Sequence, residues 1–197
     1  MGLSDVVYNQ YGMDKIASVS NATLANTYAL DIADSSARQS VCWVFGSMQL
    51  NQNGQAFLRY RLLDSSDSPM DMLFSTGGSA TSNRTYVGNT ASLTQVNMSY
   101  WSGGNDNYTT YVGGEMAHFW IVINQEQSGI TPIHRRSVVH RCLTHTDTSV
   151  AIGHGAAEIK DGSVARKIEF HADSTTYGDA NITINATSYS VHSEYEF

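Results

Sequence analysis

Residues 117–123 read AHFWIVI, with apolar side chains on both alternating faces except at His118. A short run of this kind is typical of a central β-strand that is covered on two sides. Around it, from Leu24 to the last residue, apolar positions alternate with Ser, Thr, Asn and Tyr in short runs that stop at Gly, Asn, Asp or Ser. Regularly spaced short strands with such turn residues are typical of a β-sandwich or a barrel.

The pattern therefore predicts an all-β fold, an antiparallel two-sheet β-sandwich of jelly-roll-like type with about ten strands. The sandwich domain is assigned to residues 24–197. Residues 1–23 are expected to form a short N-terminal arm that lies on a neighbouring subunit. The expected strands cover residues 27–33, 40–50, 56–63, 70–74, 84–87, 93–100, 109–124, 137–146, 150–159, 166–172 and 182–195. Asn53-Gly54 predicts a hairpin between the second and third of these.

The composition favours a protein that assembles with others. Charged residues make up 15% of the chain, against about 25% in an average soluble protein. Lysine occurs only three times, while the chain contains 11 Tyr, 3 Trp and 7 Met. Interfaces between proteins are depleted in Lys and enriched in aromatic residues and Met. The alternative is a stable monomer with an uncharged, Ser/Thr-rich exterior.

The charge balance argues against two classes of partner. The net charge is −7, and the basic residues Arg135, Arg136 and Arg141 form the only small cluster. Nucleic acids and anionic membranes need a concentrated cationic patch, so neither is expected to bind. We expect no secretory signal, because the first residues have no basic start and no apolar run. Cys42 and Cys142 are accordingly expected to be two reduced core thiols rather than a disulfide.

Histidine and cysteine cluster in one part of the chain. His134, His140 and His145 flank Cys142, and His154 follows. Zinc accepts both residue types, but this spacing matches no familiar ligand set. We therefore expect histidines at loops, strand edges or a subunit contact, and no metal or other cofactor.

Neither the acidic turns nor the candidate nucleophiles indicate a calcium site or a catalytic site. Residues 64–68 with Asp71, and residues 105–107, have the oxygens for calcium but lack the twelve-residue loop spacing. Asp and Ser also stabilise turns, which is the interpretation we favour. The chain has no Gly-x-Ser-x-Gly motif and no distinctive pair of carboxylates, so we expect no enzyme.

Aromatic residues gather around loops rich in Gly and Asn. Tyr86, Tyr100, Trp101, Tyr108 and Tyr111 could form a platform on which sugars stack, although aromatic residues on strands are more often core or interface. We predict interface roles for a set drawn from the arm, these loops and the basic cluster. Its members are Tyr8, Tyr11, Met13, Trp101, Tyr108, Tyr111, Arg135 and Arg136.

The chain resembles β-rich virion structural proteins of tailed phages, especially phages of aquatic and cyanobacterial hosts. The resemblance rests on an early entry segment, a middle region and a closing pair of strands. These segments are 13–17 (MDKIA), 27–32 (TYALDI), 57–62 (FLRYRL), 84–89 (RTYVGN), 167–170 (KIEF), 182–184 (ITI) and 189–191 (YSV).

This resemblance implies a jelly-roll-like sandwich that assembles, often as a homotrimer, on a phage capsid or tail, after synthesis in the host cytoplasm. A capsid decoration (cement) protein is the first expectation. Such a protein stabilises the shell through contacts with coat subunits. The alternatives are a tail or tail-fibre component and a carbohydrate-binding β-sandwich module.

Overall fold

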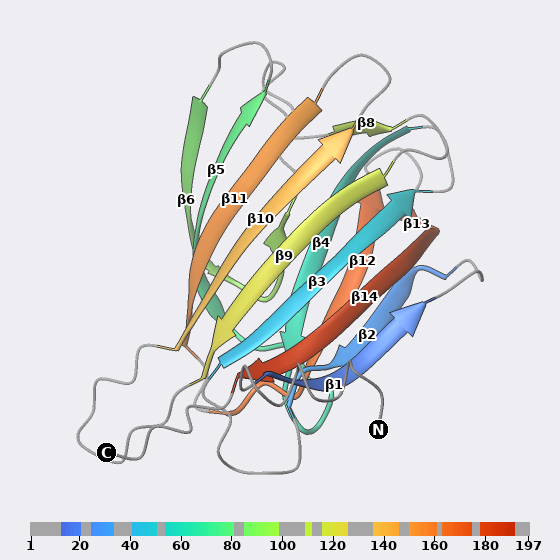
Figure 1. Cartoon of the computed structure of the whole chain (residues 1–197). Helices are drawn as coiled ribbons and strands as arrows, with labels where there is room; N and C mark the ends of the chain where they lie inside the picture. Colours follow the sequence, from blue (N-terminus) through green and yellow to red (C-terminus); the bar gives the residue numbers. More distant parts are fainter. Residues whose placement is uncertain are drawn as a thin grey trace.

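The computed structural model describes residues 13–20, 25–33, 41–50, 54–80, 85–98, 109–111, 116–125, 136–145, 150–160, 163–174 and 178–191. These residues form two antiparallel sheets packed face to face, as Figure 1 shows. The predicted all-β sandwich is thus confirmed. The described residues include no helix of the length and apolar character that crossing a membrane requires.

The larger sheet contains eight strands and the smaller sheet six. In pairing order, the larger sheet consists of β1 (Met13–Ser20), β14 (Ile182–Val191), β3 (Val41–Leu50), β9 (Met116–Asn124), β10 (Ser137–His145), β11 (Val150–Ile159), β5 (Met72–Ala80) and β6 (Thr85–Leu93). The smaller sheet consists of β13 (Gly178–Ala180), β12 (Lys167–Ser174), β4 (Gly54–Leu63) and β7 (Val96–Asn97), with β2 (Thr27–Asp31) paired to β12 and β8 (Thr109–Tyr111) paired to β4. From β1 to β5 the chain alternates between the two sheets.

That alternation contradicts the hairpin predicted at Asn53-Gly54. The strand before this dipeptide, β3, pairs with β14 and β9 in the larger sheet. The strand after it, β4, pairs with β12, β7 and β8 in the smaller sheet. An Asn-Gly pair favours a tight turn only locally. Here the choice of sheet decides the connection, because β3 and β4 each bury one apolar face against the other sheet.

Part of the predicted arm is an edge strand of the larger sheet. β1 pairs with β14 of the same chain, from Met13 opposite Val191 to Ser20 opposite Asn185, with a bulge between Lys15 and Ala17. Ser188 of β14 is buried beneath this bulge, and its hydroxyl accepts a hydrogen bond from the Ala17 amide at 3.2 Å. The same hydroxyl donates to the Asp31 carbonyl at 2.6 Å. Residues 13–20 therefore lie on their own chain; residues 1–12 are outside the described part.

The core lies between the sheets and is filled by both. Phe119 of β9 and Phe170 of β12 meet there, with ring centroids 5.0 Å apart. Gly46 of β3 leaves the space for this contact, since a Cβ atom on it would lie 2.8 Å from Cζ of Phe119 and 2.6 Å from the Asn185 carbonyl oxygen. Burial of a Phe side chain contributes roughly 1.5–3 kcal/mol, so this pair is a substantial link between the layers.

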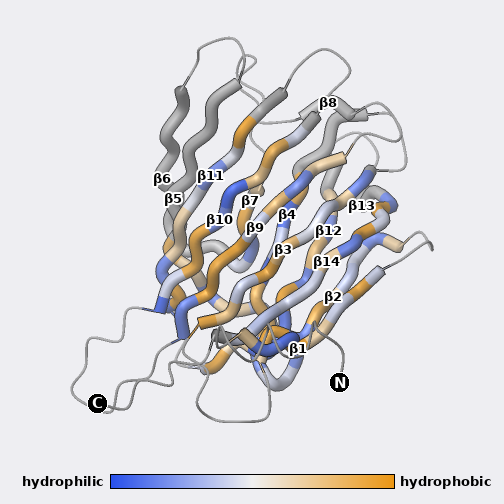
Figure 2. Tube along the Cα trace, viewed as in Figure 1, coloured by the Kyte–Doolittle hydropathy of each residue, from blue (hydrophilic) through white to orange (hydrophobic). Residues whose placement is uncertain are grey.

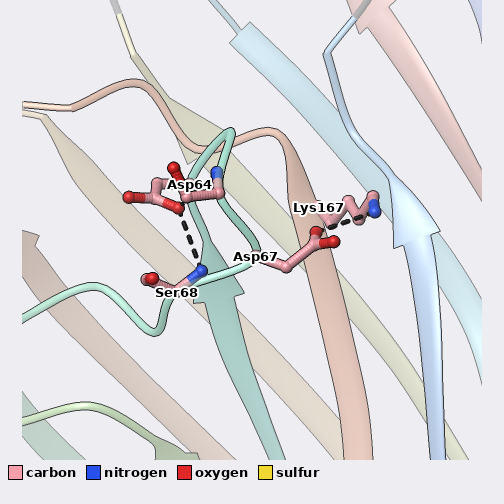
Figure 3. Close-up of polar contacts among 5 residues, drawn as sticks. Asp64, Asp67, Ser68 and Lys167 are labelled. Atoms are coloured by element: carbon pink, nitrogen blue, oxygen red, sulfur yellow. Dashed lines mark hydrogen bonds and ion pairs between the residues drawn. The ribbon is translucent and has the colours of Figure 1, made fainter.

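The acidic turn predicted at residues 64–68 is present at the end of β4 (Figure 3). Asp64 Oδ1 accepts hydrogen bonds from the amides of Ser66 at 2.7 Å and Ser68 at 2.9 Å. Asp67 has a positive φ of 58°. Its Oδ1 lies 2.7 Å from Nζ of Lys167 on β12, a contact that raises the pKa of Lys167. Asp64 thus stabilises the turn, as the turn interpretation predicted, while Asp67 forms an ion pair that was not expected.

Candidate functional site

The outward face of the larger sheet carries large apolar side chains. Along β9, burial alternates, so that Phe119 and Ile121 point into the core while Trp120 and Val122 point outward and remain half-buried. The prediction that residues 117–123 are covered on both sides is therefore wrong for the described part of the chain. One side faces the smaller sheet, and the other is the front of the molecule in Figure 1.

Neighbouring strands extend this apolar region. We call it the aromatic face and define it by the outward side chains of Trp43, Phe45, Trp120, Val122, Val139 and Tyr189. They come from four adjacent strands, β14, β3, β9 and β10. In Figure 2 apolar segments run along β9 and β10 in the middle of this sheet.

Strand register aligns these side chains in rows across the sheet. One row runs from Tyr189 through Trp43 and Val122 to Val139, each directly opposite the next. In the next row Phe45 lies opposite Trp120. Directly opposed residues on one face have Cβ atoms about 4.5–5.5 Å apart, close enough for their side chains to interact.

The aromatic rings of this face pack against one another. Trp43 and Phe45, two residues apart on β3, stack with centroids 5.6 Å apart and an interplanar angle of 17°. Trp43 also lies 6.3 Å from Trp120, and Phe45 meets Tyr189 edge to face at 6.2 Å. Ring pairs at such distances stabilise each other by about 0.5–1.5 kcal/mol. The cluster therefore presents a pre-ordered surface.

Exposure confirms that the apolar character is concentrated on this side. The exposed large hydrophobic residues among those described all lie at outward positions of the larger sheet: Phe45 (41% exposed), Leu73 (44%), Met116 (38%) and Val139 (42%). Single exposed apolar residues are ordinary, but a contiguous patch usually marks a contact with another molecule. We take the aromatic face as the candidate functional site.

Five of the eight predicted interface residues, Tyr8, Tyr11, Trp101, Tyr108 and Arg135, lie outside the described residues.

Three members of that predicted set are described. Met13 begins β1 and is half-buried, and Tyr111 pairs with Gly54 through its backbone in β8. Arg136 is 7% exposed, and its guanidinium donates to the carbonyl of Ser163. Arg136 thus holds a connection within the fold instead of presenting a charge at the surface.

The expected placement of the histidines is wrong for His140. It lies in the middle of β10 and is 1% exposed, because it shares the inward phase of Val138 and Cys142. Its Nδ1 is 3.2 Å from the hydroxyl of Tyr60 on β4. Burial lowers the pKa of His140 to about 3, with a smaller effect in the same direction from His154. His140 is therefore neutral near pH 7 and links the two sheets, whereas His118 and His154 are exposed.

The two cysteines are free and buried, in agreement with the prediction of reduced core thiols. Burial raises the pKa of each thiol to about 12, which opposes formation of the reactive thiolate. Within the described ranges, no three His, Cys, Asp or Glu side chains come together in a way that could hold a metal ion.

Half of the signal for this site lies in the local sequence pattern. Alternation along residues 40–50 puts Val41, Trp43 and Phe45 on one strand face, and these residues share the outward side of β3. The outward position of Trp120 and Tyr189 could not be predicted, because it depends on which side of the larger sheet the smaller sheet covers.

The aromatic face has the chemistry of a protein-contact surface, since it is broad, apolar and almost uncharged. Comparison with protein-family models, with curated proteins and with solved structures finds no match to this chain.

Proposed function

We propose that this protein is a non-enzymatic structural component of a phage virion, and specifically a capsid decoration protein that stabilises the shell by protein–protein contacts. The observation that carries the proposal is the aromatic face. A contiguous apolar surface of this kind is stabilised when another protein removes it from water, at about 25 cal/mol for each Å² buried. Such a role requires buried area and no cofactor.

Two further properties support the proposal. Low charge, few lysines and many aromatic residues suit a chain that remains packed in an assembly. Two buried free thiols suit a protein that folds and assembles in the reducing cytoplasm of a host cell. The short strand patterns shared with tailed-phage virion proteins supply the specific expectation of a capsid or tail location.

The decisive experiment is quantitative mass spectrometry of purified virions. A decoration protein is expected at a copy number close to that of the coat subunits. A few copies per particle would instead assign the chain to the tail or a tail fibre, the alternative within the same class. Absence of the chain from purified particles would refute the proposal.

A carbohydrate-binding module is a second candidate, because exposed aromatic residues on a sheet can stack on sugars. The ring geometry weighs against it here. A sugar stacks flat on an aromatic ring whose face is open to water, whereas Trp43 and Phe45 cover part of each other's faces. A glycan array probed with the purified protein separates the two functions, since glycan binding that is lost in Trp43→Ala would favour the module.

A further inference from the structure

We infer that the aromatic face is covered by another copy of the same chain. This inference deepens the proposed function and rests on its claim that the protein acts by assembly. It names the surface and the partner that occupies it. Three properties support it: the size of the larger sheet, the charge of the four strands that carry the face, and the shape of the sheet.

The larger sheet, whose adjacent strands β14, β3, β9 and β10 carry the aromatic face, has the dimensions that a stable contact between copies needs. Eight strands at a spacing of about 4.8 Å and nine residues at a rise of about 3.3 Å give a sheet of roughly 34 by 30 Å, or about 1,000 Å². A standard stable interface buries about 800 Å² on each partner. A second copy that covers most of this sheet therefore reaches the required area, while a short peptide leaves much of it in water.

The charge distribution favours a copy over a partner of opposite charge. On β14, β3, β9 and β10 the outward positions hold one formal charge, Arg141, although the chain as a whole has a net charge of −7. The described acidic residues lie on other elements, such as Asp14 on β1, Glu158 on β11 and Glu169 on β12. Two copies can bring these faces together with little direct repulsion, and the repulsion between the rest of the molecules is screened by salt.

The shape of the face also suits a second copy. Extended sheets pack well on other sheets, about 10 Å apart and with their strands within about 30° of each other. Another copy supplies such a sheet with the same rows of large side chains, and Phe45 and Val139 are the most exposed of them on the central strands.

The first test is the mass of the purified full-length chain in solution, by analytical ultracentrifugation over a range of concentrations. We expect an oligomer whose association strengthens as salt is raised. Replacing both residues in Phe45→Thr/Val139→Thr is expected to weaken association by roughly tenfold or more, because two anchors of the contact lose apolar area. The control Ala29→Ser, at an exposed position on the smaller sheet, is expected to leave it unchanged.

The second test locates the contact directly. Val139→Cys places a reactive thiol on the aromatic face, while Cys42 and Cys142 are buried and do not compete. We expect a short thiol cross-linker to join chains through Val139→Cys and not through Ala29→Cys. Thermal unfolding of every variant establishes that each remains folded.

A wild-type chain that stays monomeric at micromolar concentration would overturn the inference, as would an oligomer unaffected by the double substitution. These failures are distinct from failure of the proposed function. A monomer in solution that is nonetheless abundant in purified virions keeps the proposed function and rejects the second copy. An oligomer that forms through the aromatic face but is absent from purified virions keeps the second copy and rejects the proposed function.

Discussion

The outer faces of the two sheets differ in how their side chains find partners. On the smaller sheet, Arg61 of β4 contacts Glu169 of β12, with Nε and Nη2 at 2.6 and 2.5 Å from the same carboxylate oxygen. His171 and Gln95 form a further polar contact at 3.1 Å. On the larger sheet, the corresponding outward positions of the central strands hold Trp43, Phe45 and Trp120, which contact each other.

This difference shows which of the two surfaces would gain more from being covered. Partly exposed ion pairs remain well solvated and contribute little to stability, so the smaller sheet gains little from being covered. The larger sheet leaves aromatic area in water, which is unfavourable until something buries it. Substitutions on the two faces, and in the core between them, should therefore have separable effects on stability and on assembly.

The largest expected effect lies in the core, next to the aromatic face. Phe119→Ala removes the inward ring that meets Phe170 and is expected to lower the free energy of unfolding by about 3–5 kcal/mol. Trp120→Ala, the next residue along β9, points outward and should mainly weaken assembly. Chemical denaturation and sedimentation of both variants measure the two effects. Equal losses of stability would show that the two sides of β9 do not differ as described.

Gly46→Ala tests the packing that supports the aromatic face from inside. The new Cβ atom would lie 2.6 Å from the Asn185 carbonyl oxygen and 2.8 Å from both Ala186 Cβ and Phe119 Cζ. Overpacking of this kind usually costs about 1–3 kcal/mol, and the backbone oxygen cannot move aside easily. The midpoint of thermal unfolding should fall. The neighbouring outward substitution Ser47→Ala is the control, and an unchanged Gly46→Ala midpoint would contradict the close approach.

His140 makes stability depend on pH through the core and not through either outer face. Its pKa is about 3 in the folded chain against 6.5 for an ordinary histidine. Between these values the unfolded chain binds a proton that the folded chain does not. The free energy of unfolding therefore falls as pH decreases below 6.5, by at most about 1.4 kcal/mol per pH unit.

The variant His140→Gln retains a side chain that can bond to Tyr60 but removes this titration. Urea unfolding of both proteins from pH 7 to pH 4.5 should give a flatter pH dependence for the variant. Parallel curves for the two proteins would mean that His140 titrates normally in the folded state.

The smallest effect is expected on the outer face of the smaller sheet. Arg61→Gln removes the ion pair with Glu169. The side chain of Arg61 is 34% exposed and that of Glu169 is 14% exposed. Solvent screening limits the loss to about 1 kcal/mol or less. Sedimentation should show unchanged assembly, in contrast to the Phe45→Thr/Val139→Thr protein. Loss of assembly in Arg61→Gln would show that the contact between copies involves the smaller sheet and not the aromatic face.

The sequence predicted many strands because alternation is a local property, but the single strand expected at 109–124 is two strands, β8 and β9, and the strands β1 and β13 were not expected. The expected strand at 150–159 is β11, and the one at 137–146 differs from β10 by one residue. The prediction of an all-β sandwich follows from many such segments. Each strand packs its apolar face into the core whichever strands lie beside it. Its residue range can therefore be predicted without knowing the topology.

The candidate site was harder to predict because it depends on distant parts of the chain. The outward side chains of residues 117–123 are apolar, and the sequence alone does not show whether the same chain or another molecule covers them. Likewise, Asn53-Gly54 has turn chemistry in either topology, and only the assignment of β3 and β4 to different sheets rules out the hairpin. His140 was misplaced for the same reason, since its inward phase depends on which side of β10 is covered.

The bulge in β1 has a consequence for how such molecules can associate. A sheet edge that recruits a strand exposes a fresh edge each time, so growth by that route has no natural end. With an irregular border strand fastened by the Ser188 hydroxyl, this end of the larger sheet is a poor template for further pairing. The contact inferred through the aromatic face would instead consume the surface that forms it, so we expect closed assemblies of fixed size and not fibres.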